Sequence, residues 1–375
     1  MRKAFKYKLY PNRVQAEAMS QMLETHRRLY NNALADRKES WEQEQISIKY
    51  AEQSVRMKTE RAENPYLTFT NFSSCQATLR RLDKSYQAFF RRVKTGEKVG
   101  YPRFKGRNRF DSVEFPSYGD GCKITDGRVY FQHIGKVKAK WHRALPEEAV
   151  IKTVRFKREA DGWHVIFSCE LPDTACVQSN SAPIGIDLGL KAFLVTSDGE
   201  SIEPPKFYRQ SEAQLRRNQR TVARRKKGSN RRRKAVQSVA KLHQHVKNQR
   251  KDFHHKVALS LVRQFGMIAH EDLNIKGIAR TRLAKSTHDV GWAQFLAILL
   301  YKAEEAGTEL MAVPPKNTTQ VCSVCGALPD TPLTLKDRVY QCASCFQVSD
   351  RDVNAARNIL RLGLSLQALT KQTAA

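Results

Sequence analysis

The sequence contains no apolar run that approaches the roughly 20 residues a helix needs to cross a bilayer. Its polar beginning, MRKAFKYKLYPN, also lacks the apolar core of a signal peptide. Cysteine is scarce, with 8 among 375 residues, and Cys75, Cys122, Cys169 and Cys176 show no paired spacing. We therefore expect a cytosolic prokaryotic protein with no membrane partner, in which these four cysteines are buried thiols rather than disulfides.

Negative charge is also scarce, because 37 acidic residues stand against 66 Lys and Arg. The net charge of +29 and the pI near 10.0 create a field that attracts polyanions, most often nucleic acid. A merely soluble basic surface, or attraction to an anionic membrane, is the alternative. The hydrophobic fraction of 41% argues against general disorder, and the length predicts two or three domains.

The remaining four cysteines form two CxxC pairs, Cys322 with Cys325 and Cys342 with Cys345, separated by sixteen residues. Two such turns supply the tetrahedral sulfur shell that zinc prefers. Two disulfides or four unrelated thiols are the alternatives. Zinc held by four cysteines has no open position for water, so this predicted ribbon is structural and the chemistry must lie beside it.

The first half of the chain changes character near residue 96. Residues 2–10 alternate like a strand, and a helical region from 13 to about 41 continues into a polar stretch that reaches residue 63. A further helix begins after residue 71. From residue 96, short alternating runs with Asp-Gly turns predict a small antiparallel barrel or sandwich, which the first strand completes. Residues 172–182 are typical of a linker.

Acidic residues lie at the ends of three later elements. Asp187 ends an apolar strand, Glu271 ends another, and either Asp350 or Asp352 opens the last helix, where an acid can also be only a cap. This order suits an RNase H-like fold, in which distant carboxylates converge at one sheet edge. Converging carboxylates repel one another unless divalent cations neutralise them. Two magnesium ions would do so while activating water and stabilising the leaving oxygen of a phosphodiester.

A polycationic segment at about 209–256 has two thin apolar stripes divided by Gly228, which predicts a helical hairpin. A charge run is usually a solvated face, but here roughly a third of the residues are Lys or Arg, which favours contact with a phosphate backbone. The candidate residues are Arg224, Arg225, Lys226, Lys227, Arg231, Arg232 and Arg233. In the later helix around WAQFLAILLYKAEEAG, we expect Phe295, Leu296, Leu299 and Leu300 to face a core.

The chain resembles the TnpB (OrfB) family of bacterial insertion sequences, which is related to type V CRISPR effector nucleases. The resemblance rests on KYKLYPN, GYPRFKG, IGIDLGLK, NQRKDFHHK, EDLNIKG, GWAQFLAILLYKAEEAG, the CxxC pairs and DRDVNAARNIL, of which the last four are the most specific. It implies an RNA-guided DNA endonuclease of a transposable element, with a RuvC-type catalytic domain, a helical recognition lobe and a wedge-like barrel.

By position, the resemblance implies the catalytic, magnesium-binding residues Asp187, Glu271 and Asp352. Asp352 is preferred over Asp350 because the acid of the family precedes xNAA, a choice that spacing alone leaves open. The implied α+β organisation comprises a wedge-like β-barrel (1–12 and 96–178), a helical recognition domain (13–95) and a RuvC-like nuclease domain (182–375). The last contains the basic hairpin (about 209–256) and the zinc ribbon (about 316–348).

The resemblance further implies two nucleic-acid partners, a guide RNA transcribed from the end of the element and a double-stranded target DNA with a short motif read by protein. Gln76 and Arg80 are candidates for reading that motif, with ordinary helix-surface residues as the alternative. The sequence does not fix the oligomeric state, and we expect a monomer. A nuclease-inactive RNA-guided repressor and an unguided transposase or nuclease are the competing functions.

Overall fold

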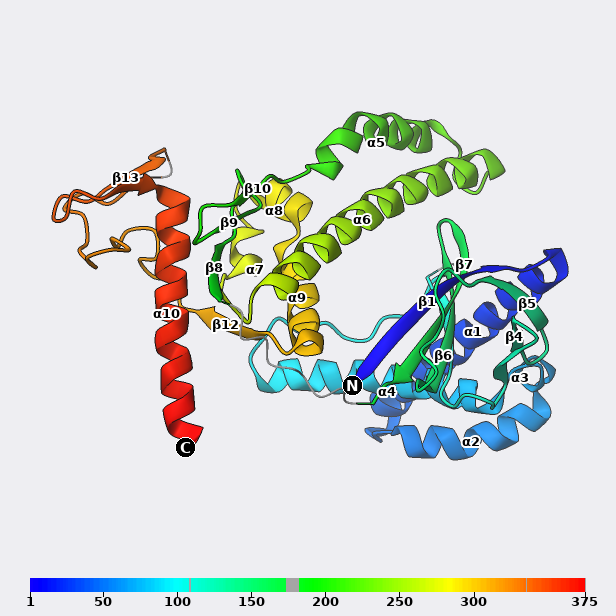
Figure 1. Ribbon diagram of the computed structural model, residues 1–375. Coiled ribbons are helices and arrows are strands. Elements are labelled where there is room, and N and C mark those ends of the chain that lie inside the picture. The colour runs from blue at the N-terminus through cyan, green and yellow to red at the C-terminus, as the bar shows by residue number, and fades with distance from the viewer. Residues whose placement is uncertain (108, 173–181, 335, 375) are drawn as a thin grey trace. The chain divides into compact units, whose positions relative to one another are not determined.

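The computed structural model of the protein describes residues 1–107, 109–172, 182–334 and 336–374. The chain has an α+β fold and forms two compact units, Met1–Thr174 and Ala175–Ala375 (Figure 1). Most of the predicted linker at 172–182, together with Cys176, lies outside the described residues. None of the described helices is both long and apolar enough to cross a bilayer.

The first unit contains a seven-stranded antiparallel sheet in the order β2-β6-β7-β1-β5-β4-β3. Its strands are β1 (Arg2–Tyr10), β2 (Ser112–Phe115), β3 (Cys122–Thr125), β4 (Arg128–Phe131), β5 (Gly135–Lys140), β6 (Val150–Glu159) and β7 (Gly162–Glu170). β1 lies in the middle, paired with β7 on one side and β5 on the other, so the first strand joins the later sheet as predicted. Among the described residues β2 and β3 are not paired with each other, so closure into a barrel stays a prediction.

The hydrophobic core of this unit follows the two-residue period of its strands. The buried apolar residues of the two central strands are Phe5, Tyr7, Leu9, Trp163, Val165, Phe167 and Cys169. The Asp126-Gly127 turn joins β3 to β4 with φ of 52° and 67°, as a two-residue hairpin turn requires. The strand alternation and this hairpin are therefore confirmed.

Four helices separate β1 from β2 in the sequence. They are α1 (Arg13–Glu44), α2 (Tyr50–Glu63), α3 (Pro65–Thr68) and α4 (Phe72–Lys94). α1 begins with a reciprocal capping box, in which the Asn12 side chain accepts from the Gln15 amide and the Gln15 side chain accepts from the Asn12 amide. It runs past its predicted end, and Gln45, with a left-handed φ of 57°, separates it from α2.

The second unit is built on a five-stranded sheet in the order β10-β9-β8-β11-β12. Its strands are β8 (Pro183–Asp187), β9 (Leu194–Thr196), β10 (Ser201–Ile202), β11 (Met267–Glu271) and β12 (Glu309–Val313). β8, β11 and β12 are parallel, whereas β9 and β10 continue the sheet antiparallel from β8. Parallel strands require crossover connections, and helices supply them here.

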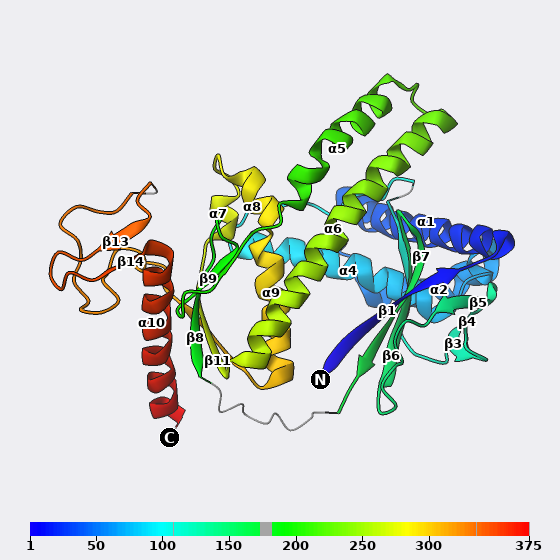
Figure 2. The same cartoon turned by 45° about the horizontal axis from the view of Figure 1, so that its top comes forward.

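Helices cover both faces of this second sheet (Figure 2). They are α5 (Phe207–Arg224), α6 (Asn230–Gln264), α7 (Ile275–Ile278), α8 (Ala284–Val290), α9 (Trp292–Ala306) and α10 (Arg351–Ala374). Ile184, Ile186 and Ile268 pack with α6 and α9, whereas Met267 and Ala269 pack with α10. Successive strand residues therefore serve opposite faces, as two covered faces require.

α10 approaches β8 so closely that only glycine fits between them. A Cβ built on Gly185 would lie 2.1 Å from the Ala356 carbonyl oxygen, and Ala355 and Ala356 are fully buried. The small residues in IGID and in NAA therefore set the distance between the strand and the helix. This contact places the start of α10 beside the end of β8.

The prediction for the core face of α9 is partly wrong. Phe295 and Leu299 are buried as expected, but Leu300 is 59% exposed and Ile298 is buried instead. The buried positions follow the 3.6-residue period from Trp292, which moves Leu300 to the outer face.

We expect Gly185→Ala to lower the unfolding free energy by about 1–3 kcal/mol or more, because the new Cβ collides with backbone rather than with a movable side chain. Denaturant unfolding of the full chain measures the change. Gly100→Ala is the matched control, since a Cβ there meets nothing within 4 Å. Equal stability of the two variants would contradict the close approach of α10 to β8.

Candidate active site and adjoining cysteine cluster

The structure brings the three predicted acids to one edge of the second sheet. Asp187 is the last residue of β8 and Glu271 is the last residue of β11. These strands are parallel neighbours, with Ile186 opposite His270, so their carboxyl ends meet. Asp352 is the second residue of α10, the helix that packs against both strands.

Asp187 lies close enough to the other two acids for their negative charges to affect it. The pKa of Asp187 is raised to about 7, first by burial and then by the negative charges of Glu271 and Asp352. The pKa of Glu271 is also raised by burial, although a hydrogen bond from the Thr318 hydroxyl opposes that shift. The site therefore concentrates negative charge in a poorly solvated place, which is unfavourable unless cations neutralise it.

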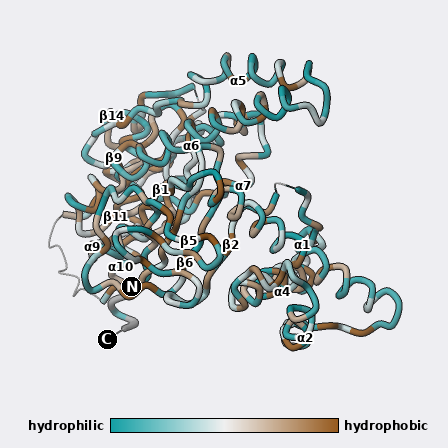
Figure 3. The backbone as a smooth tube through the Cα atoms, turned by 90° about the vertical axis from the view of Figure 1, so that its right-hand side faces the viewer, coloured by the Kyte–Doolittle hydropathy of each residue, from teal (hydrophilic) through white to brown (hydrophobic). Residues whose placement is uncertain are grey.

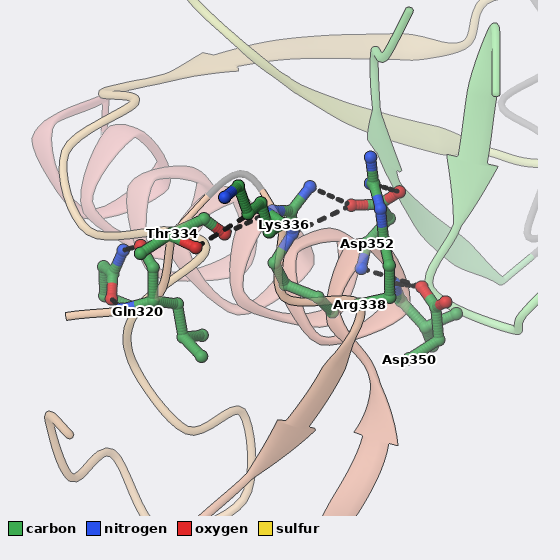
Figure 4. A network of polar contacts seen from close by, with 9 residues as sticks. Gln320, Thr334, Lys336, Arg338, Asp350 and Asp352 are labelled. Atoms are coloured by element: carbon green, nitrogen blue, oxygen red, sulfur yellow. Dashed lines mark hydrogen bonds and ion pairs between the residues drawn. The ribbon is translucent and has the colours of Figure 1, made fainter. Parts of the chain in front are cut away.

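Two arginines supply positive charge to Asp352 (Figure 4). Arg351 donates from Nε and Nη2 to Oδ1 at 3.2 and 2.9 Å, and Arg338 Nη1 lies 3.7 Å from Oδ2. Arg351 also donates to the Thr334 carbonyl oxygen at 3.2 Å. The catalytic candidate on α10 is thus tied to the segment between the two CxxC pairs.

Asp350 and Asp352 have different local roles in the structure. Asp350 Oδ1 accepts from the backbone amides of Asp352 and Val353, at 2.8 and 3.2 Å. This is the capping role that an acid at a helix start can serve. Asp352, in contrast, contributes to the charge that Asp187 senses.

Buried amides of α10 hold the chain that leads into the cysteine cluster. Asn354 donates to the Val321 carbonyl oxygen and accepts from the Ser323 amide. Asn358 donates to the carbonyl oxygens of Thr318 and Val321, at 2.9 and 2.7 Å. Because the Thr318 hydroxyl reaches Glu271, these bonds connect α10, the base of the cluster and the second acid.

Sequence reasoning did not identify Thr318, Arg338, Arg351, Asn354 or Asn358 as parts of the site. One signal was available for the asparagines, because two amide side chains four residues apart share one face of a helix. Nothing local marks the other three, whose partners are distant in the sequence or depend on side-chain direction.

The four paired cysteines converge, with their sulfur atoms all within 4.8 Å of one another. The closest Sγ–Sγ distances are 3.6 Å for Cys322 and Cys345 and 3.5 Å for Cys325 and Cys342, well beyond a disulfide bond. Backbone amides of Cys345 and Ser344 lower the pKa of the Cys342 thiol to about 6. Four convergent thiols, one of them readily ionised, fit a tetrahedral zinc site.

The strands β13 (Val339–Gln341) and β14 (Val348–Asp350) form a small antiparallel sheet within this region. The other cysteines that the structure describes, Cys75, Cys122 and Cys169, are buried free thiols, as expected. The disulfide alternative is therefore not supported for any cysteine in the described part of the chain.

The predicted basic hairpin consists of α5 and α6, which lie side by side (Figure 1). No acidic residue occurs from 213 to 251, and hydrophilic residues run along α5 (Figure 3). Arg224, Arg225, Lys226, Lys227, Arg231 and Arg233 are exposed, and Arg232 is partly buried. Such a concentration of one charge is suited to a polyanion.

Gln76 and Arg80 lie on α4 in the first unit, where both contact α2. Gln76 donates to the Ser54 hydroxyl at 3.2 Å, and the Arg80 guanidinium lies 5.4 Å from the centre of the Tyr50 ring. Arg80 is nevertheless exposed. Their role in reading bases stays a prediction.

Comparison with sequence families gives three matches. Residues 166–282 match a family described as "Probable transposase", and residues 292–359 match "Cas12f1-like, TNB domain". Residues 1–45 match a "Helix-turn-helix domain", although β1 and the single helix α1 occupy that range here.

Individual proteins are similar over nearly the whole chain. A protein of Streptomyces pristinaespiralis named "Putative RNA-guided DNA endonuclease" is 33% identical over 377 residues, covering 98% of this chain and 91% of the relative. "Putative RNA-guided DNA endonuclease InsQ" of Escherichia coli (strain K12) is 28% identical over 386 residues, with coverages of 97% and 93%. The fold is similar to that of Cas12f1 in a solved Cas12f1-sgRNA-target DNA complex, with a TM-score of 0.60, 16% identity and coverages of 92% and 82%.

The raised pKa of Asp187 predicts a specific pH dependence of stability. A carboxyl whose pKa is about 7 in the folded protein and about 4 in the unfolded chain stabilises the folded state at low pH. That contribution is lost as pH rises through the folded value. In magnesium-free buffer, we expect the wild type to lose on the order of 1–4 kcal/mol relative to Asp187→Asn between about pH 5 and pH 8.

Urea unfolding of both proteins across this pH range measures the difference. Asp198→Asn is the control, because Asp198 is an exposed acid in the same unit. If the difference in unfolding free energy between the wild type and Asp187→Asn stays constant with pH, the electrostatic account is wrong.

Replacing Cys322 and Cys342 by Ser should remove roughly one equivalent of bound zinc per chain and lower the melting temperature of the second unit. Elemental analysis of the purified protein gives the zinc content. The double variant Cys122→Ala/Cys169→Ala removes as many thiols from elsewhere and should leave zinc unchanged. Undiminished zinc in the Ser variant would rule out this cluster.

Proposed function

The chain belongs to the TnpB (OrfB) family of RNA-guided DNA endonucleases, and on this premise we propose that it cuts target DNA selected by a bound guide RNA in a prokaryotic cytosol. Relatives that align with nearly the full length of both chains establish the family. The reaction is hydrolysis of phosphodiester bonds, and the enzyme is associated with a transposable element.

The observation that carries the proposal is the convergence of Asp187, Glu271 and Asp352 at the carboxyl ends of parallel strands. These groups offer only oxygen ligands, which magnesium prefers, and their mutual repulsion would be relieved by divalent cations. The residues present therefore fit a two-ion magnesium site. When bound, magnesium would activate water and stabilise the leaving oxygen of a phosphodiester.

The arrangement of the second sheet supports the assignment of a RuvC-like domain to residues 182–375. β8, β9 and β10 run antiparallel to their neighbours, and β11 adds in parallel to β8 and β12 in parallel to β11. The crossover between β8 and β11 contains the basic hairpin, and the cysteine cluster lies between β12 and α10. The sequence places these two insertions at about 209–256 and about 316–348.

The residues of the chain have separable roles in this proposal. Asp187, Glu271 and Asp352 hold the cations, and Thr318 orients Glu271 by its hydrogen bond. Arg338 and Arg351 hold the Asp352 carboxylate and bring positive charge to the place where a phosphodiester would lie. The zinc ribbon is structural, since its four thiols leave no open coordination position.

Nucleic-acid recognition is divided between the protein and the RNA. The exposed cations around the tip of the α5–α6 hairpin bind phosphates of guide RNA and heteroduplex, while base pairing selects the sequence. The fold shared with Cas12f1 supports this division. We assign the wedge-like barrel to 1–12 and 96–178 and the recognition helices to 13–95, with Gln76 and Arg80 reading the motif beside the target. The working form is a monomer.

The proposal predicts that the chain, expressed with its native flanking DNA, copurifies with one abundant RNA that ends at the border of the element. That complex should cut matched DNA in the presence of magnesium. Asp187→Ala should reduce cutting by at least about 100-fold, or about 2.7 kcal/mol, with RNA and target binding retained. Asp198→Ala, an exposed acid in the same unit, is the control and should cut normally.

Three outcomes would contradict this function. Cutting by Asp187→Ala would remove the assigned site. Target binding by the wild type without cutting would indicate an RNA-guided repressor. Cutting without any discrete RNA would indicate an unguided transposase or nuclease.

A further inference from the structure

The basic hairpin is capped by a residue from a helix about eighty positions away. α5 begins at Phe207 after Lys206, which has a left-handed φ of 50° and provides no side-chain cap. Asp289, in α8, accepts from the Tyr208 amide at 2.9 Å and from the Arg209 amide at 3.3 Å. Asp289 is 7% exposed, and its negative charge faces the positive end of α5.

Further contacts join α8 to both helices of the hairpin. From α5, Glu212 pairs with Lys285 at 2.7 Å and Arg209 donates to the Ser286 hydroxyl at 2.8 Å. From α6, Arg250 donates to the carbonyl oxygens of His288 and Asp289. Nε2 of His254, also in α6, lies 2.9 Å from the Val290 carbonyl oxygen. The root of the hairpin and α8 therefore form one hydrogen-bonded block.

α8 lies on the stretch of chain that begins directly after Glu271. Asp272 donates its amide to the Val313 carbonyl oxygen at 2.8 Å, and Asn274 caps α7. Successive short turns then lead from α7 to α8. The segment 272–290 is thus anchored at one end to the site and at the other end to the hairpin.

From this geometry we propose that Asp289 is a positioning residue, which couples nucleic acid held by the α5–α6 hairpin to the position of Glu271. The proposal rests on the proposed function for its nucleic-acid ligand. A polyanion that binds the exposed tip of the hairpin restricts the motion of α5 and α6. Because the capped root of the hairpin is bonded to α8, the motion of residues 272–290 is restricted as well. Without the carboxylate, two amides at the start of α5 lose their acceptor and its first turn loosens, so the segment is held to the hairpin mainly through the contacts of α6 and follows it less closely.

Hydrogen–deuterium exchange of the full chain tests this coupling. The probe is a 30-base-pair RNA–DNA heteroduplex of arbitrary sequence, which the hairpin would hold through phosphates alone. In the wild type, we expect the heteroduplex to slow exchange in α5 and α6 and also, by at least about threefold, in 272–290. In Asp289→Ala, we expect protection of the hairpin to remain and protection of 272–290 to fall clearly below that of the wild type, because only the contacts from α6 are left intact.

Asp252→Ala is the matched control. Asp252 is an exposed acid of α6 that pairs with Lys256 at 2.8 Å, so its removal changes charge without removing any of the contacts to α8 described above. It should behave like the wild type.

Guided cutting gives a second measurement. Asp289→Ala should lower kcat about tenfold with little change in KM and should spread the cut positions. Mere loss of folded protein would leave kcat per active molecule and the cut positions unchanged.

Undiminished protection of 272–290 in Asp289→Ala, or no protection of this segment in the wild type, would overturn the proposal. If Asp289→Ala does not fold, Asp289→Asn takes its place, because it keeps one acceptor oxygen and should lose protection only in part. Full protection in Asp289→Asn would then overturn the coupling. Exchange is measured without cutting, so coupled protection in a protein that never cuts would reject the proposed function and leave the positioning role intact.

Discussion

The second unit depends on one constraint, the desolvation and mutual repulsion of three clustered carboxylates. Glu271 is buried, and Asp187 and Asp352 are partly buried. Burial, together with the negative charges of Glu271 and Asp352, raises the pKa of Asp187, so the ionised site costs folding free energy. The structure opposes this repulsion by packing and by counter-charges. Gly185 lets α10 lie against β8, and Arg338 and Arg351 hold the acid at the start of that helix. Divalent cations would complete the neutralisation, so the same arrangement that costs stability prepares the chemistry.

The cysteine cluster and the basic hairpin serve this centre in different ways. The chain that leads into the cluster is held against α10 by hydrogen bonds from Asn354 and Asn358. The cluster and these bonds together place Thr318 and Arg338 beside the acids. The hairpin instead keeps its positive charges at one end and its buried apolar residues at the other. Its tip is cationic and exposed, whereas the C-terminal part of α6 buries Val257, Leu261 and Val262 against the sheet. A hydrogen-bonded root and an exposed tip crowded with positive charges suit a polyanion that is bound through its phosphates and not by its base sequence.

The sequence predicts those features whose causes are local. Apolar runs that end in an acid place Asp187 and Glu271 at strand ends, and paired spacing gathers four cysteines. Distinguishing Asp352 from Asp350 needed the family resemblance, since both stand at a helix start. In the structure Asp350 caps the helix, and the charge of Asp352 raises the pKa of Asp187.

Features that depend on distant partners were not predictable in the same way. The cap from Asp289 to α5 and the bond from Thr318 to Glu271 join residues that only the tertiary fold brings together. The interruption after Glu44 has no glycine or proline to mark it, and on α9 Ile298 rather than Leu300 joins Phe295 and Leu299 in the core.

The most direct test of the central claim is to locate manganese, as a substitute for magnesium, by anomalous scattering in crystals of the RNA-bound protein. Two ions about 4 Å apart, contacting Asp187, Glu271 and Asp352, are the predicted result. Ions bound at Asp350 instead, or no ion near Asp187 at saturating manganese, would contradict the account.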